Sequence, residues 1–366
     1  MPVPRIPASC RSCFVLACSL CLMSSGTAQA SLELRKELAE AAKDIKQLLD
    51  ARGDNRIGVG QFTTSPKLRA SSGPGIALLL AEELKRAGVS VDTDSKFYVE
   101  GKYEDVIDAR DELLAVRLKF AIIDGKTTKV ITELERGVKG NTDIAQLLGV
   151  TVAPPLNGDK KERNQEIQKR IDMRQVHIAG SRVAADASSP FAIEVLVADK
   201  PREASDDKGR AFVQIKRDEI YAVRLINNSP NEVAVELTID GLSMFAFSKL
   251  RDAADRPRYN RVVIAAGKSL LIKGWHRDNS VSDSFLVTEY AKSAAAKLPS
   301  TADVGTITAS FAAAWPQGGT LPEGEPANGE KSGDATGFGP PVEAKFMEVK
   351  RSLGVNRATV SVRYTR

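Results

Sequence analysis

The stretch from Leu113 to Leu134, LLAVRLKFAIIDGKTTKVITEL, decides the architecture of the first half of this chain. From residue 114 to residue 120, large apolar residues alternate with Ala, Arg and Lys. This alternation predicts a strand that buries one face. Asp124-Gly125-Lys126 predicts a hairpin turn, and residues 130–134 predict the return strand. We therefore expect a long antiparallel pair at the centre of a sheet.

Helices and short strands surround this hairpin. Apolar residues recur at intervals of three and four in two segments before it, as on the buried face of a helix, and Pro74 stands near the start of the second segment. The expected helices cover residues 34–49, 71–88 and 142–148, and the expected strands cover residues 57–62 and 97–99. Together they predict an α/β domain over residues 31–153, with a mixed sheet and flanking helices.

Residues 154–210 are more polar than the segments on either side. They open with Pro154-Pro155-Leu156-Asn157-Gly158 and continue as a charged run from Asp159 to Arg174. One apolar stretch, Phe191 to Val197, has the length of a strand. We expect a linker that contains one strand.

Residues 211–366 are dominated by strand patterns. Residues 233–239 alternate between apolar and polar or small side chains, and residues 262–272 predict a hairpin around Gly267. Gln317 to Pro341 is rich in Gly, Pro and Glu and predicts a mobile loop, after which Ala358 to Tyr364 predicts a last strand in the same sheet. The expected fold class is α+β, an α/β domain followed by a mainly-β, sandwich-like domain.

The first thirty residues have the pattern of a secretory signal peptide. Arg5 and Arg11 precede a short apolar run, and Ala28-Gln29-Ala30 is typical of a cleavage site, so we expect the mature chain to begin at Ser31. Two alternatives are an uncleaved N-terminal anchor and a lipid on Cys18. The expected location is the periplasm or the exterior of the cell, with peripheral association to the envelope as one possibility.

The composition of the mature chain excludes several classes of function. The four cysteines, Cys10, Cys13, Cys18 and Cys21, all lie in the leader, which removes disulfides and thiolate chemistry from the mature protein. Cleavage removes two arginines and no acidic residue, so the net charge falls from +5 to +3. Such a balance does not suit a nucleic-acid partner. No later apolar run approaches the length of a transmembrane helix.

The motifs that could carry chemistry are incomplete. Gly267-Lys268-Ser269 and Gly125-Lys126-Thr127 end like phosphate-binding loops but lack the glycine that the motif requires five residues earlier. The only histidines are His177 and His276, too few for a usual zinc site. We therefore assign no catalytic residue, cofactor or metal ligand. The residues that could face a ligand are Tyr259, Trp275 and His276.

Part of the first domain resembles a known group. The run Arg56-Ile57-Gly58-Val59-Gly60-Gln61-Phe62, the helix from Gly75 to Arg86 and Tyr98-Val99-Glu100-Gly101-Lys102-Tyr103 carry the resemblance. They resemble the envelope α/β domains of the curli secretion lipoprotein, the flagellar outer-membrane protein FlgO and the amino-terminal domain of TolB. The resemblance implies a role in envelope assembly. The second domain is similar to an uncharacterised β-sandwich module of bacterial exported proteins, which implies a fold and no activity.

These observations predict an exported, non-catalytic envelope protein that binds other envelope proteins or its own copies. One alternative is a carboxylate-dependent hydrolase of the envelope that uses Asp240, Asp278 or Asp283, and two carboxylates in one pocket would favour it. Another is a carbohydrate-binding module, for which Trp275 would have to lie flat and exposed beside Tyr259.

Overall fold

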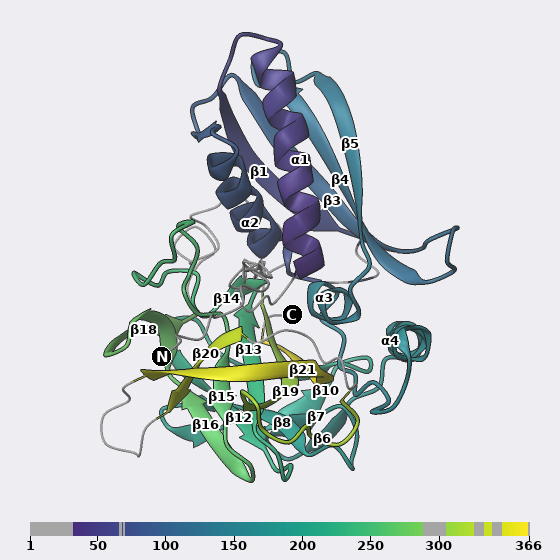
Figure 1. Ribbon diagram of the computed structural model, residues 1–366, viewed down its shortest axis with the longest axis vertical. Coiled ribbons are helices and arrows are strands. Elements are labelled where there is room, and N and C mark those ends of the chain that lie inside the picture. The colour runs from purple at the N-terminus through teal and green to yellow at the C-terminus, as the bar shows by residue number, and fades with distance from the viewer. Residues whose placement is uncertain are drawn as a thin grey trace, which may run out of the picture.

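The computed structural model describes residues 32–65, 68, 70–287, 305–325, 333–338 and 346–364; of residue 32 and of residues 333–338 it describes the backbone. The expected leader, with its cleavage site between Ala30 and Ser31, lies outside the described residues. The described part has the expected α+β fold, with a helix-covered sheet at one end and two further sheets at the other (Figure 1). Within it, no helix is both long and apolar enough to cross a bilayer.

The first domain is a two-layer arrangement of helices on a five-stranded mixed sheet. Its elements are α1 (Leu32–Asp50), β1 (Arg56–Thr64), α2 (Gly73–Arg86), β2 (Ser90–Val91), β3 (Phe97–Ile107), β4 (Leu114–Asp124), β5 (Val130–Val138) and α3 (Asn141–Leu147). The strand order is β2-β1-β3-β4-β5; β1 runs parallel to its neighbours, and β3, β4 and β5 are antiparallel. The hairpin expected from Leu113 to Leu134 is confirmed.

One face of this sheet is covered and the other is open. Helices α1 and α2 lie side by side on the covered face (Figure 1). Val116, Leu118 and Phe120 of β4 point into this layer and are fully buried. On the open face, Lys119 pairs with Glu104 at 3.2 Å. The period-two alternation of β4 therefore produces one apolar and one charged surface.

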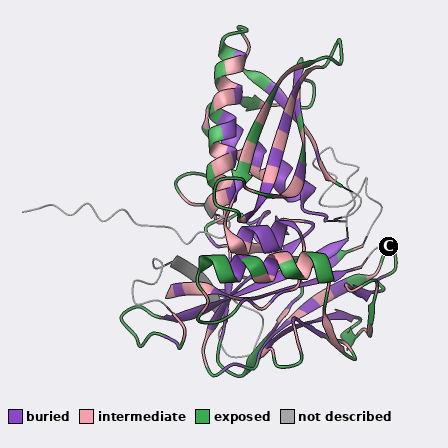
Figure 2. Cartoon of the chain, turned by 90° about the vertical axis from the view of Figure 1, so that its right-hand side faces the viewer, coloured by how far each residue is buried: buried purple, intermediate pink, exposed green. Residues whose placement is uncertain are grey.

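The segment expected to be a linker, residues 154–210, is folded, and that expectation is wrong. It contains α4 (Lys160–Met173), β6 (His177–Ala179), β7 (Arg182–Ala184), β8 (Phe191–Val197), β9 (Lys200–Pro201) and β10 (Ala204–Asp206). Asp159 and Glu162 form a reciprocal capping box that starts α4. The helix lies on the outside of the molecule (Figure 2), and Ile167 is its one buried apolar side chain, so its sequence has the composition of a loop.

The second domain consists of two sheets with one shared core. Its remaining strands are β11 (Ala211–Val213), β12 (Ile220–Asn227), β13 (Val233–Ile239), β14 (Leu242–Ser243), β15 (Val262–Ile264), β16 (Lys268–Ile272), β17 (Gly274–Asp278), β18 (Val281–Leu286), β19 (Thr306–Pro316), β20 (Gly333–Phe338) and β21 (Phe346–Arg363). The first sheet has the order β10-β11-β21-β19-β13-β15-β20, with β14 beside β13. The second has the order β17-β18-β12-β8-β7-β6, with β16 beside β12 and β9 beside β8. Phe191 of one sheet stacks on Phe311 of the other at 5.3 Å.

Three expectations for this domain had different outcomes. The last strand is confirmed: β21 pairs with β19, and Val360 and Val362 are fully buried. The hairpin expected over residues 262–272 is wrong, because β15 pairs with β13 whereas β16 pairs with β12 in the opposite sheet. Of the loop expected over residues 317–341, residues 333–338 form β20, so that part is wrong; residues 326–332 and 339–341 lie outside the described residues.

The two domains are in direct contact. The turn between β13 and β14 consists of Asp240 and Gly241, both with positive φ (54° and 75°), as in a tight type I′ hairpin. This turn lies against the first residues of α2, where Gly75 meets the carbonyl of Gly241. At a second place, Val152 and Thr359 exchange backbone hydrogen bonds of 2.8 Å. At these two places, backbone atoms of one domain are therefore in direct contact with backbone atoms of the other.

Candidate functional site

A cavity of about 120 Å³ lies at this junction. Helices α1, α2 and α3 form one side, and β13, β14 and the loop of residues 252–260 form the other. The apolar part of its wall consists of Leu34, Ile76, Leu78, Leu79, Leu147, Leu242, Ala246 and Pro257. The polar part includes Asp143 and Gln146 from α3 and Glu236 from β13. Both domains thus contribute to one small site.

Two carboxylates are buried in this wall. Asp143 is 5% exposed and Glu236 is 6% exposed. Glu236 lies between Val235 and Leu237, which point into the sandwich core, so strand alternation directs its side chain to the opposite face, toward α3. Asp143 lies in the first turn of α3. Docking of α3 on the sandwich therefore buries both acids together.

Burial changes the protonation of both groups. Loss of water around Asp143 raises the pKa of its carboxyl to about 7, and the charge of Glu236 adds to this rise. Burial also raises the pKa of Glu236, against the lowering effect of the Arg261 guanidinium and of a hydrogen bond from Gln146. Near neutral pH, Asp143 is thus held between its charged and neutral forms.

Three acceptor atoms in this wall lack a donor. They are Oδ1 of Asp143, Oε1 of Gln146 and Oε2 of Glu236, each buried and each without a hydrogen-bond partner among the described residues. A buried polar group without a partner costs about 1–3 kcal/mol, and more if it is charged. Such groups are rare in native structures and call for an explanation. The three residues line the cavity, but these three atoms themselves are fully buried.

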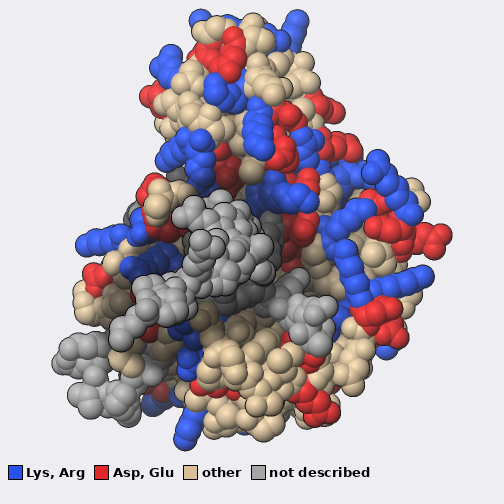
Figure 3. Space-filling model, viewed as in Figure 1, with Lys and Arg blue, Asp and Glu red and all other residues tan. Residues whose placement is uncertain are grey.

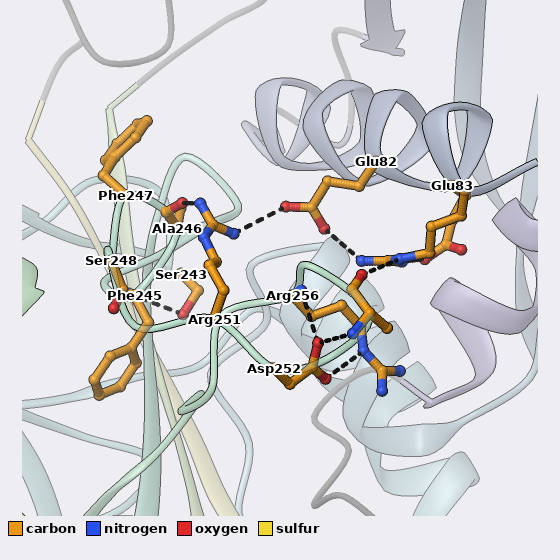
Figure 4. Close-up of polar contacts among 12 residues, drawn as sticks. Glu82, Glu83, Ser243, Phe245, Ala246, Phe247, Ser248, Arg251, Asp252 and Arg256 are labelled. Carbon is orange, nitrogen blue, oxygen red and sulfur yellow. Dashed lines mark hydrogen bonds and ion pairs between the residues drawn. The ribbon is translucent and has the colours of Figure 1, made fainter. Parts of the chain in front are cut away.

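The arginines around the cavity are engaged elsewhere. Arg35 pairs with Glu82 at 3.1 Å and with Glu83 at 3.3 Å. Figure 4 shows these two glutamates on α2 facing the sandwich loop that carries Arg251, Asp252 and Arg256. Arg251 lies 3.9 Å from Glu82, and Arg256 pairs with Asp252 at 2.8 Å. Within the described part of the chain, neither Asp143 nor Glu236 forms an ion pair within 4 Å. The wall carboxylates are therefore left without a close cation.

Glu82 and the Arg251–Arg256 segment also join the domains at the rim. Arg86 of α2 donates a hydrogen bond of 3.1 Å to the carbonyl of Ala254 and contacts Glu83. The rim is thus a mixed network of both charges, whereas the wall below it has unpaired acceptors.

His276, expected to face a ligand, is a core residue. It has no exposed surface. Phe245 and Phe346 lie with ring centroids 5.0 Å from the imidazole. Its Nδ1 is 3.1 Å from Oγ of Ser248, its Nε2 is 3.4 Å from Oδ1 of Asn279, and burial lowers its pKa. This Ser–His–Asn chain resembles a hydrolase triad in composition, but Ser248 is only 2% exposed, so a substrate has no access to it.

The other two expected residues do not form a sugar platform. Trp275 is half-buried and meets Phe247 and Phe285 edge to face, at 5.3 and 5.2 Å. Tyr259 is 2% exposed and donates a hydrogen bond of 3.1 Å to Glu348. Of the three expected residues, only Tyr259 lines the cavity.

Each of the acidic residues named for a hydrolase has hydrogen-bond or ion-pair partners of its own. Asp240 accepts hydrogen bonds from the backbone of Gly305 and Thr306 and from the hydroxyl of Tyr364, which identifies it as a structural anchor of the β13–β14 turn. Asp278 caps the turn before β18, and Asp283 pairs with Arg277 at 2.8 Å. Sequence reasoning missed Asp143 and Glu236, since neither has a local motif.

The described residues contain no group of three or more His, Asp or Glu side chains placed to hold a metal ion. Comparisons of the chain with models of protein families, with curated proteins and with solved structures find no match.

Proposed function

We propose that this is an exported, non-catalytic envelope protein that binds a partner protein, and that it receives a side chain of the partner in the junction cavity. The observation that carries the proposal is the size and place of the cavity. At about 120 Å³ it is smaller than the roughly 300–1,000 Å³ of a small-molecule pocket. It is large enough for one side chain, and its rim is formed by two domains whose surfaces extend away from it.

The distribution of charge supports a protein partner. On the face drawn in Figure 3, basic and acidic side chains are interspersed over both domains, without a continuous basic surface. Phosphate backbones bind to concentrated Lys and Arg, and a mixed surface suits a protein interface. The leader pattern of residues 1–30 supports export.

A second candidate is a carboxylate-dependent hydrolase, because two carboxylates, Asp143 and Glu236, meet in one cavity. An acid–base pair of this kind needs one carboxyl protonated and the other ionised, with environments that separate their pKa values. Here burial raises the pKa of both groups. The environments act in the same direction, which favours binding over catalysis.

Site-specific photo-crosslinking tests the proposal. A photoreactive phenylalanine analogue replaces Leu79 or Pro257, both half-buried at the cavity, in the full-length chain expressed in its native host. The matched control carries the analogue at Lys126, an exposed residue of the β4–β5 turn. We expect one discrete protein adduct from the cavity positions, weakened by Ala246→Phe, which fills the cavity, and absent from the control.

Adducts that are the same at all three positions would show that the cavity has no part in capture. Hydrolysis of envelope polymers by the purified chain, abolished by Asp143→Asn or Glu236→Gln with the fold intact, would establish the hydrolase instead. The crosslinking pattern and the hydrolysis assay are independent measurements, so each of the two functions is tested by its own experiment.

A further inference from the structure

We propose that residues 251–258 form a lid over the junction cavity, and that this lid opens away from α2 to admit the side chain of the partner. The admission of a side chain rests on the proposed function, whereas the movement of the lid is argued from contacts within this chain alone. Four residues of the loop contribute to the wall of the cavity: Asp252, Arg256, Pro257 and Arg258. The loop therefore lies between the cavity and the exterior of the sandwich domain.

The base of the lid is fixed in the sandwich. The backbone N–H of Arg258 donates a hydrogen bond of 2.9 Å to the carbonyl of Leu250, so the two ends of the loop are joined. Leu250 packs against the sandwich core. Tyr259, which follows the loop, is 2% exposed and donates a hydrogen bond of 3.1 Å to Glu348. A movement of the loop would therefore turn about this anchored base.

Hydrogen bonds inside the lid keep its shape without any contribution from α2. Oδ1 of Asp252 accepts from the backbone N–H groups of Ala254 and Arg256, both at 2.9 Å. Oδ2 of Asp252 accepts from Nε of Arg256 at 2.8 Å (Figure 4). An aspartate that bonds to the backbone two residues further on stabilises a turn locally. The loop can therefore move as one unit.

The tip of the lid is attached to α2 at the molecular surface. Arg86 donates a hydrogen bond of 3.1 Å to the carbonyl of Ala254, and Arg251 lies 3.9 Å from Glu82. Arg86, Arg251 and Ala254 are all exposed. Exposed polar contacts of this kind contribute little to stability, because water competes for the same groups. The contacts that close the lid can thus be replaced by water, whereas its base is buried.

The place of these contacts suits a closing role. Glu82 is part of the cavity wall, and Arg86 lies about one helical turn beyond it on α2. The lid therefore reaches α2 at the end of the cavity. The apolar side chains that an open lid would make accessible are Ile76, Leu79, Leu242 and Ala246. A lid that closes again would shield a bound side chain from water.

Thiol labelling of the full mature chain tests the movement. The chain from Ser31 onward contains no cysteine, so a single introduced cysteine is the one thiol that reacts. Ala246→Cys and Leu242→Cys are two separate reporters in the cavity wall, at positions that are 7% and 2% exposed. The rate of their reaction with N-ethylmaleimide, followed by intact mass, reports how often the lid is open.

Arg86→Met removes the hydrogen bond to Ala254 and keeps an apolar side chain on the surface of α2. We expect it to raise the labelling rate of either cavity reporter about three- to tenfold. The matched control is Lys85→Met, which removes the same charge from the neighbouring exposed position and should leave the rate unchanged. A third reporter, Val152→Cys, is fully buried at the second contact between the domains, and its rate should not respond to Arg86→Met.

Three outcomes would overturn the inference. One is a labelling rate of the cavity reporters that is the same with Arg86→Met as with Lys85→Met. Another is an equal rise at the Val152→Cys reporter, which would show that the domains separate or the chain unfolds. The third is labelling of the cavity reporters as fast as in urea, which would show a cavity that is open without any movement. The labelling needs no partner, so its failure leaves the photo-crosslinking result standing, and the absence of crosslinks leaves the lid standing.

Discussion

Gly75 of α2 and Gly241 of the β13–β14 turn touch across the junction of the two domains: a Cβ atom on Gly75 would lie 2.1 Å from the carbonyl oxygen of Gly241. Gly241 is equally confined, because a Cβ on it would lie 2.8 Å from the main chain of Ser72 and its φ is 75°. Both glycines line the cavity between the domains. The contact therefore links the stability of the junction to the shape of the site.

Gly75→Ala should destabilise the protein, since the new methyl group overlaps main-chain atoms that cannot rotate away. We expect a loss on the order of 2 kcal/mol or more in the free energy of unfolding, measured by urea denaturation. The matched control is Gly137→Ala in β5, where an added Cβ meets nothing within 4 Å. Equal stability of the two variants would show that the domains are not held as closely as described.

Asp143→Asn should change how stability depends on pH. The folded-state pKa of Asp143, about 7, is above its ordinary value of 3.8, so the folded chain binds the proton more tightly than the unfolded chain. The contribution of this group is therefore most favourable at low pH and is lost as the pH rises toward 7. The Asn variant has no such proton to lose. The stability of the variant relative to the wild type should therefore be higher at about pH 8 than at about pH 5.

This prediction is checked by urea denaturation of both proteins across that pH range. Between pH 5 and the folded-state pKa of about 7, the difference has a ceiling of about 3 kcal/mol. A wild type and variant whose stabilities stay parallel at all pH values would show that Asp143 does not titrate as described.

Asp240→Asn should weaken the β13–β14 turn without changing its backbone shape. Asn tolerates the positive φ of this position, but its amide replaces an acceptor of hydrogen bonds from Gly305, Thr306 and Tyr364. We expect a loss of about 1–3 kcal/mol in urea denaturation. Asp255→Asn serves as the control, because Asp255 has a similar φ of 55° and is exposed.

Removal of residues 358–366 should prevent the second domain from folding. The strand β21 lies between β11 and β19 in the first sheet, and Ala358, Val360 and Val362 are fully buried. The truncated chain would lose the end of β21 that pairs with β11 and with residues 306–311 of β19, and both strands would be left with an unpaired edge, so we expect aggregation. A chain that ends at Tyr364 is the control. Sharp thermal unfolding of a monomeric chain without residues 358–366 would contradict the topology.

Local patterns predicted the strands and helices whose burial follows a regular period. The hairpin of β4 and β5 was predictable because one strand face is apolar and the turn residues lie in line. The helix α4 was missed because it buries a single apolar side chain, Ile167, and its charged residues have the composition of a loop. The partners of β15 and β16 were misassigned, since a short turn can join two strands of one sheet or pass the chain between sheets, and the residues do not distinguish the two.

The sequence by itself determined the α+β class, the two-sided nature of β4 and the burial of the last strand, because these follow from which side chains avoid water along a local repeat. Only the tertiary structure decided the site. Asp143 and Glu236 are 93 positions apart in the chain, on α3 and β13, and each resembles an ordinary surface acid in its own segment. Docking of the two domains removes water from both, and that desolvation, which no local pattern encodes, gives them their shifted pKa values and their unpaired oxygens.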